Sequence, residues 1–570
     1  MVVPSRVAAL AAACALAALV AACDRQQSAA STSTAAPATP VAPAERAAAA
    51  TTVAAAAAAH ADGAARSGIA WREAANDAQV DAAFAAARDE HKPLFMYWGA
   101  KWCPPCNHVK ATLFNRQDFI ERSRAFVPVY VDGDSPGAQK IGARFKVSGY
   151  PTMVLFNADG KEMTRLPGEV EPARYTEVLT LGMDASRPVG ALLADALARP
   201  AALGPSDWRL LAFYSWETDQ QQVIGKDKLP ATMRALADAC PESAAPDAAM
   251  RLRLKALAFT EGRAPAKVDA ATRTAVMALL ADPAKTREQT DIVSNYASEI
   301  VRAMSAKGSA ERKALVAAFD TALQRLVADT TLSRADRTEA LIARVDLVRV
   351  DEPEADPAKP AAPRAKPHLP DSLVAEVRDH AARMDREITD GYERQAVVTA
   401  CAYLLERAGL GDESDALLKA NLAKSHSPYY LMSELAVNAK KRGDKAEALR
   451  WYREAYERSE GPATRLQWGA SYIAALVELA PHDEPAIEAA TTQLWSEAAT
   501  QPDAFYMRSG RSLQKVGEKL RAWNKGGAHR ASMARMEAKL GELCAAPGRS
   551  DDERATCRKL LTAPAKAATA

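Results

Sequence analysis

Apolar and polar residues follow different patterns along the chain, which divide it into four regions. Residues 7–22 form one continuous apolar run, and residues 23–67 are mostly Ala, Ser, Thr and Pro with few charges and no periodicity. Residues 68–188 mix short apolar strands with helical spacing, whereas helical spacing dominates residues 189–570. The patterns predict an export signal, a tether, a compact α/β domain and a large helical region.

The first region has the form of a signal peptide over residues 1–22. Arg6 precedes the apolar run, and Ala21 and Ala22 stand directly before Cys23. The run is shorter than a usual membrane span. Small residues before a cysteine resemble the lipobox of bacterial lipoproteins, which implies cleavage of the signal and lipidation of Cys23. An ordinary secretory signal and a retained anchor helix are the alternatives.

The resemblance to lipoproteins implies an extracytoplasmic location. Asp24 resembles the signal that retains such lipoproteins in the inner membrane of enteric bacteria. We therefore expect a periplasmic protein with a lipid anchor, and the inner membrane is favoured. Residues 23–67 cannot bury enough apolar surface to fold alone, so we interpret them as a disordered tether.

The third region, residues 68–188, predicts strands and helices in a compact α/β order. Turn residues at 157–160 separate two of the strands, as in a hairpin. The predicted strands are 94–98, 126–131, 152–156 and 162–166, and the predicted helices are 77–90, one that begins at the cysteine pair and extends through 114, and one from about 172.

A pair of cysteines stands where the first strand passes into a helix. Cys103 and Cys106 enclose two prolines. At a helix start, unpaired N–H groups and the positive end of the helix dipole favour a thiolate, and prolines in the first turn stiffen the bridge. We predict that Cys103 attacks a disulfide and that Cys106 then resolves the mixed disulfide.

Three other roles compete for this pair. Zinc requires three or four ligands, and no second CxxC or His pair stands nearby. Haem attachment requires His directly after the second cysteine, where Asn107 stands, and His108 comes one place late. A structural disulfide across so short a loop stabilises little. The pattern favours redox chemistry, with no metal and no cofactor besides the cysteine pair.

Motifs around the pair stand in the order and spacing of the thioredoxin family. They are Trp102–Cys106, Gly149–Thr152, Phe156 and Gly168. The domain is most similar to periplasmic thioredoxin-like domains, such as the C-terminal domain of the Dsb membrane thiol-disulfide reductase, over about 120 of the 570 residues.

The resemblance implies several site residues and shows one departure. Pro151 is expected to be a cis-proline, and Trp102, Tyr150 and Pro151 are expected to form the substrate-binding edge. The family usually places a buried aspartate six residues before the first cysteine as a proton relay, but Tyr97 stands there. A phenol is a poor base near neutral pH, so no relay is assigned. His108 is interpreted as an exposed helix residue rather than as a group that tunes Cys103.

The fourth region divides at a stretch rich in proline. A helical domain at 189–350, a linker or loop at 351–370 and a TPR-like helical domain at 371–570 are predicted. Helical spacing in the first of these domains covers residues 207–218, 231–239, 248–260, 286–306, 310–328 and 334–348.

An internal repeat is predicted in the last domain. Residues between Leu435 and Pro462 follow the spacing of a tetratricopeptide repeat, residues between Gly411 and Pro428 give the preceding copy, and a looser copy covers 467–501. Helix pairs with Ala at their contacts occur in many helical proteins, which is the alternative. Trp451 and Tyr452 are more typical of core than of binding anchors.

Composition narrows these interpretations. Aromatic residues make up 6% of the chain and charged residues 25%. The formal net charge is only +2, and this near-neutral charge disfavours a nucleic acid or another polyanion as partner. Eight cysteines are too few for a disulfide scaffold. Cys544 and Cys557 flank a Pro-Gly break, so a stapling disulfide is expected. Cys240 and Cys401 are expected to be buried thiols, and a long-range bridge between them is the alternative.

We therefore predict a membrane-tethered extracytoplasmic thiol-disulfide oxidoreductase whose helical region docks partners. Reduction of protein disulfides is favoured, because Trp102 and the lack of His between the cysteines resemble reductants. The expected electron source is a membrane thiol-disulfide reductant. The alternatives are a helical-repeat scaffold with a weakly active thioredoxin-like domain, and a disulfide oxidase or isomerase.

Overall fold

The computed structural model describes residues 68–562, apart from 167, 169, 220–221, 244, 261–267 and 353–367. The predicted signal peptide, the lipidation site Cys23, the tether and most of the 351–370 linker lie outside the described residues. Within the described ranges, no helix combines the length and the apolar character needed to cross a membrane.

A five-stranded sheet forms the centre of the first domain, in the order β1-β3-β2-β4-β5. Strand β3 runs parallel to β1 and β2, and β4 runs antiparallel to β2 and β5. All residues of β2 are buried, as expected for a central strand covered on both faces. The strands are β1 (Arg72–Glu73), β2 (Leu94–Gly99), β3 (Val127–Asp132), β4 (Thr152–Phe156) and β5 (Glu162–Leu166).

Helices cover both faces of this sheet. Successive side chains of a strand point to opposite faces, so Phe95 and Tyr97 pack with the side of α4 and α7, whereas Met96 and Trp98 pack with the side of α3 and α6. The predicted α/β fold is confirmed. The helices of this domain are α3 (Asp77–Asp89), α4 (Pro104–Ala111), α5 (Gln117–Arg122), α6 (Ala138–Arg144) and α7 (Pro172–Met183).

The rest of the described chain is helical, as predicted. Two predictions are wrong in detail. The helix predicted at 207–218 ends at Phe213, because Tyr214 is extended, and the stretch 286–306 is broken at Gln289 and Tyr296, whose backbone angles are not helical. The helices up to the proline-rich segment are α8 (Val189–Ala198), α9 (Pro205–Phe213), α10 (Leu229–Ala239), α11 (Pro246–Ala258), α12 (Ala270–Ala281), α13 (Pro283–Glu288), α14 (Thr290–Asn295), α15 (Ala297–Met304), α16 (Ala310–Ala328) and α17 (Arg334–Val348).

Paired helices continue after that segment. Helices α21 and α22 form a hairpin at Gly443, whose φ of 83° ends α21 in the left-handed conformation that glycine favours. The TPR-like assignment stays a prediction. The helices here are α18 (Asp371–Glu387), α19 (Gly391–Arg407), α20 (Gly411–Asn421), α21 (Pro428–Arg442), α22 (Lys445–Arg458), α23 (Pro462–Leu479), α24 (Glu484–Ala499), α25 (Met507–Trp523), α26 (Arg530–Ala545) and α27 (Asp551–Arg558).

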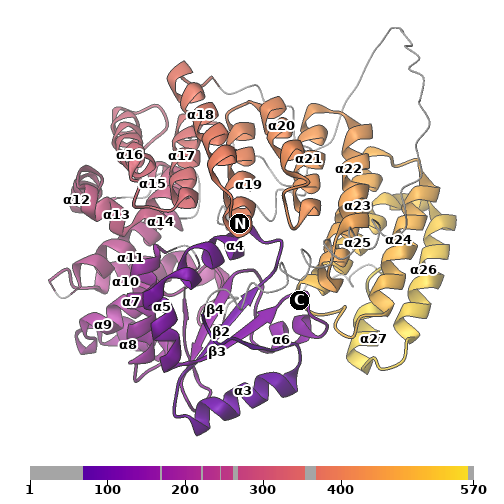
Figure 1. The fold of residues 1–570 in the computed structure, drawn as a ribbon, viewed down its shortest axis with the longest axis horizontal. Helices are drawn as coiled ribbons and strands as arrows, with labels where there is room; N and C mark the ends of the chain where they lie inside the picture. Colours follow the sequence, from indigo (N-terminus) through magenta and orange to yellow (C-terminus); the bar gives the residue numbers. More distant parts are fainter. Residues whose placement is uncertain are drawn as a thin grey trace, which may run out of the picture.

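The helical region bends into an arc around the α/β domain (Figure 1). Helix α19 packs on α4, and α25 packs on α6, so the arc touches the domain where the cysteine pair lies. Trp451 and Tyr452 are buried in the apolar cluster of the arc. The arc is therefore a partner of the α/β domain rather than a separate module.

Candidate active site

The end of β2 and the start of α4 place the cysteine pair. Cys103 is the N-cap residue of α4, and Pro104 and Pro105 occupy its first turn, where a missing N–H costs nothing. Cys103 and Cys106 are joined in a disulfide with a Cα–Cα distance of 5.3 Å. The sulfur of Cys103 accepts a hydrogen bond from the Cys106 backbone N–H at 3.2 Å. The helix start thus directs a backbone donor at the sulfur predicted to be the nucleophile.

Asn107 fixes the turn that carries the pair. Its side-chain Nδ2 donates to the carbonyl oxygens of Lys101 and Cys103, each at 2.8 Å, and the residue is fully buried. These two bonds tie the loop before α4 to the first turn of the helix. In the sequence, Asn107 counts only against haem attachment, and no local pattern indicates this structural role.

The loop before β4 lies beside the disulfide. The Tyr150–Pro151 peptide bond is cis, and the Tyr150 carbonyl oxygen lies 3.6 Å from Cys103 Sγ. Gly168 packs against the proline ring, because a Cβ at this glycine would lie 2.9 Å from Pro151 Cγ. The structure therefore brings Cys103, Tyr150 and Pro151 together.

Trp102 links the cysteine pair to Asp134. Its indole Nε1 donates to the Asp134 carboxylate at 3.2 Å. Trp102 is 6% exposed, Cys103 3% and Cys106 0%. All five residues predicted for catalysis and substrate binding thus form one cluster, and its cysteines are buried.

Three titratable groups lie on the elements that carry the cluster: Tyr97 on β2 is buried, and Asp132 on β3 and Lys110 on α4 are half-buried. The Tyr97 hydroxyl has no hydrogen-bond partner among the described residues, and burial raises its pKa, so it stays protonated near neutral pH and cannot serve as the base there. Burial, reinforced by Asp134, raises the pKa of Asp132, and burial lowers the pKa of Lys110. Neither Asp132 nor Lys110 was predicted as part of the site, although Asp132 ends an apolar strand whose register pairs it with Gly99.

The helical arc supplies residues that sequence analysis did not predict. The Arg508 guanidinium pairs with the Asp134 carboxylate at 2.6 Å and lies over the rings of Trp102 and Tyr150, at 5.2 and 5.4 Å from their centroids. Gly461 allows the chain before α23 to lie against Asp134, because a Cβ at this glycine would lie 2.6 Å from Asp134 Cβ. No local sequence signal marks these residues as part of the site.

His108 is not an exposed helix residue, which corrects the expectation. Its side chain is 18% exposed, and its Nε2 lies 3.8 Å from a carboxylate oxygen of Asp336. Asp336 belongs to α17, so the arc covers this face of α4 as well.

The remaining cysteines lie outside the cluster. Cys544 and Cys557 are joined in a disulfide with a Cα–Cα distance of 5.5 Å, which links α26 to α27. Cys240 and Cys401 are buried thiols. In the described part of the chain, no group of three or more His, Cys, Asp or Glu side chains is arranged to hold a metal ion.

A sheet with this topology, a CPPC motif at a helix start and a facing cis-proline define a thioredoxin-like domain. The family of thioredoxin-like domains matches residues 80–182. The chain is 28% identical over 113 residues to the thiol:disulfide interchange protein DsbD 1 of Pseudomonas aeruginosa, and 28% identical over 112 residues to the thiol:disulfide interchange protein DsbD of Klebsiella pneumoniae. These matches cover 19% of this chain and 19% and 18% of the two relatives, so the chain aligns with less than a fifth of the relatives' length.

Proposed function

We propose that the protein is a membrane-tethered extracytoplasmic thiol-disulfide oxidoreductase that reduces protein disulfides. The observation that carries the proposal is the Cys103–Cys106 pair at the start of α4, with Cys103 Sγ 3.6 Å from the Tyr150 carbonyl oxygen beside the cis-proline. The similarity of this domain to thiol:disulfide interchange proteins supports the same chemistry.

The proposed reaction transfers two electrons from the reduced pair to the substrate disulfide. The Cys103 thiolate attacks one substrate sulfur, so that a mixed disulfide forms and the other substrate sulfur leaves as a thiolate and takes up a proton. Cys106 then loses its proton and attacks Cys103, which releases the second substrate thiol and closes the Cys103–Cys106 disulfide. A dithiol of a membrane reductant restores the reduced pair by the same exchange.

The positions of the surrounding groups support these roles. The helix start and the Cys106 N–H favour the Cys103 thiolate, and Cys106 is fully buried, as suits a resolving cysteine. The backbone around Tyr150 and Pro151 is proposed to bind the substrate segment that carries the disulfide.

The location and the direction of electron flow belong to the same proposal. Lipidation at Cys23 would hold the protein on the periplasmic face of a membrane, with the inner membrane favoured, and the periplasm would supply disulfide-bonded substrates. Measurement of the reduction potential tests the direction: a value near about −270 mV, as in thioredoxin, supports a reductant, whereas one near about −120 mV contradicts it.

A trapping experiment tests the proposal and identifies substrates. In the Cys106→Ser variant the mixed disulfide at Cys103 cannot be resolved, so defined proteins should remain covalently attached and be released by dithiothreitol. Cys103→Ser is the matched control and should capture none. Equal capture by both variants would contradict the assigned roles.

The burial of the pair favours a second candidate function. Because Cys103 is 3% exposed, the protein would serve as a helical-repeat scaffold in which the thioredoxin-like domain binds but turns over poorly. Wild-type protein that fails to reduce a disulfide substrate under every condition would support this candidate and contradict the first.

A further inference from the structure

The helical arc covers the redox pair on the side from which a partner would approach. Thiol-disulfide exchange requires a sulfur of the partner to reach a sulfur of the pair. Reactive cysteines are usually partly exposed, but here Cys103 is 3% and Cys106 0% exposed. A protein disulfide therefore cannot reach Cys103 in this arrangement.

One contact of the arc is an aromatic clamp on Trp102. The Trp102 ring stacks on Tyr430 from α21, with centroids 5.8 Å apart, and meets the edge of Trp468 from α23 at 5.2 Å. The side-chain nitrogen of Gln395 from α19 donates to the Trp102 backbone carbonyl at 3.2 Å. Three helices of the arc thus hold the residue directly before Cys103.

A second contact is polar and centres on Asp134. Its carboxylate accepts hydrogen bonds from the backbone N–H of Thr464 at 2.8 Å and from the Thr464 hydroxyl at 2.7 Å, in addition to the 2.6 Å ion pair with Arg508. Asp134 also receives the Trp102 indole N–H. The aromatic and polar contacts are therefore connected through one carboxylate.

A third contact occupies the edge proposed for substrate binding. The guanidinium of Arg511 donates to the Ser148 carbonyl oxygen at 2.7 Å. Gln139 donates to the Tyr150 hydroxyl at 3.0 Å and accepts from the backbone N–H of Arg508 at 2.9 Å. The loop that would bind a partner is thus bound by the protein's own helices.

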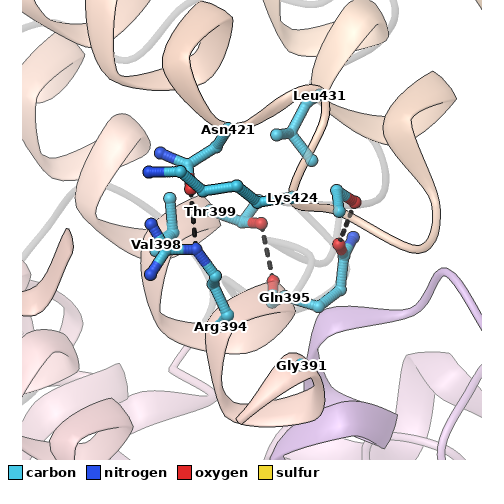
Figure 2. Close-up of a pocket in the computed structure, with 9 residues that line it drawn as sticks. Gly391, Arg394, Gln395, Val398, Thr399, Asn421, Lys424 and Leu431 are labelled. Atoms are coloured by element: carbon cyan, nitrogen blue, oxygen red, sulfur yellow. Dashed lines mark hydrogen bonds between the residues drawn. The ribbon is translucent and has the colours of Figure 1, made fainter. Parts of the chain in front are cut away.

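A small cavity lies inside the arc, among residues of α19, α20, α21 and the loop that joins α20 to α21. Figure 2 shows the cavity next to Gln395, which Arg394, Asn421 and Lys424 also line. It offers about 10 Å³ for the centre of a water molecule, which is room for about one water. This cavity is far too small to admit a substrate.

We infer that α19, α21, α23 and α25, here called the helical cap, hold the enzyme closed and must separate from the α/β domain before Cys103 reacts with a protein disulfide. The inference rests on the proposed function, whose active site it regulates. The α/β domain contributes Ala100, Trp102, Cys103 and Cys106 to the apolar cluster of the arc, and the other contacts described above are polar. Interfaces between domains permit relative movement unless they are large and hydrophobic, and here polar contacts at Asp134 and Ser148 flank the apolar contact at Trp102.

The rate of alkylation of Cys103 measures separation of the cap without requiring turnover. The reduced full chain is treated with iodoacetamide over a range of pH, and modification of Cys103 is quantified by mass spectrometry. Asp134→Asn weakens the polar contact centred on Asp134, and Gln395→Ala weakens the contact that holds Trp102. Only Asp134→Asn changes the charge of the protein. Each should raise the alkylation rate at its high-pH plateau at least tenfold, because opening of the cap limits that rate. A purely electrostatic effect would move the midpoint of the pH profile and leave the plateau unchanged.

A matched control separates the cap from general loosening of the domain. Asp118→Asn removes an aspartate that pairs with Arg116 at 2.7 Å in the same domain, with both side chains exposed. Its plateau rate should stay within twofold of the wild type. Circular dichroism establishes that each variant is folded, and Gln395→Ala carries the test if Asp134→Asn does not fold.

A tether tests the cap in the opposite direction. Lys101 Nζ and the Glu460 carboxylate lie 3.4 Å apart with side chains 47% and 70% exposed, so a water-soluble carbodiimide can join them as an amide. The tethered protein should be alkylated at Cys103 at least tenfold more slowly than Glu460→Gln treated identically. If neither the two cap variants nor the tether changes the plateau rate, the inference that the cap controls access to Cys103 is wrong.

Parallel reduction of insulin distinguishes the cap from the proposed function. Faster alkylation in the cap variants, without insulin reduction by any variant, would support the inference about the cap and contradict the proposed function. Equal insulin reduction by wild type and cap variants, with equal alkylation, would leave the function standing and overturn the cap.

Discussion

Removal of the Arg508 guanidinium should uncouple the α/β domain from the helical arc. Arg508 and Asp134 are 2.6 Å apart with side chains 11% and 12% exposed, so the pair belongs to the buried class of ion pairs. Loss of one partner of a buried pair costs about 3–5 kcal/mol, because the other charge stays buried without compensation. Arg508 also donates to Thr464 and Gln467, at 3.1 and 3.2 Å. We expect Arg508→Ala to lower the free energy of unfolding by about 3–5 kcal/mol.

Urea unfolding monitored by two probes measures this effect. Tryptophan fluorescence reports on the nine tryptophans, among them Trp102 and Trp468 at the interface, and far-ultraviolet circular dichroism reports on the helices. The transitions should coincide in the wild type and separate in Arg508→Ala. Arg116→Ala is the control, because its exposed pair with Asp118 is of a class that contributes about 0–1 kcal/mol. A loss below about 1 kcal/mol for Arg508→Ala would refute the reasoning, because the pair would then behave as a surface pair.

Three further predictions concern stability. Asn107→Ala removes the two 2.8 Å bonds of the active-site turn and should lower the free energy of unfolding by about 1–3 kcal/mol in urea titrations; no change would show that the turn is held by other contacts. Burial and the neighbouring Arg383 and Arg337 lower the pKa of His380 to about 4 from its usual 6.5, so stability should be lost as pH falls below about 6.5, and His380→Gln should flatten this dependence in thermal melts. The Cys544–Cys557 bridge closes a separation of 13 residues, so Cys557→Ser should cost about 3 kcal/mol, and an unchanged melting temperature would contradict this contribution.

Local signals explain which elements the sequence predicted well. The strands 152–156 and 162–166 agree with the structure to the residue, because a turn at 157–160 separates two apolar runs. Helices 310–328 and 334–348 also agree, because Ser309 and Ser333 cap their first turns. The break at Gln289 and Tyr296 was not predicted, because neither proline nor glycine marks it.

The candidate site was predictable only on the side of the α/β domain. A local motif specifies the cysteine pair, and the resemblance to thioredoxins pointed to Tyr150 and Pro151. The cap residues were not predictable, because hydrogen bonds join Gln395 to Trp102 across 293 positions and Arg508 to Asp134 across 374 positions. Contacts at such separations leave no periodicity in the sequence, and Arg508 reads as an ordinary polar residue of a helix.

The most direct test of the central claim is the rate at which the full chain, supplied with dithiothreitol, reduces the disulfides of insulin. The account predicts reduction faster than with dithiothreitol alone, its loss in Cys103→Ser, and an increase in Gln395→Ala, which frees the pair. Insulin reduction by Cys103→Ser at the wild-type rate would contradict the claim that the Cys103–Cys106 pair carries the chemistry.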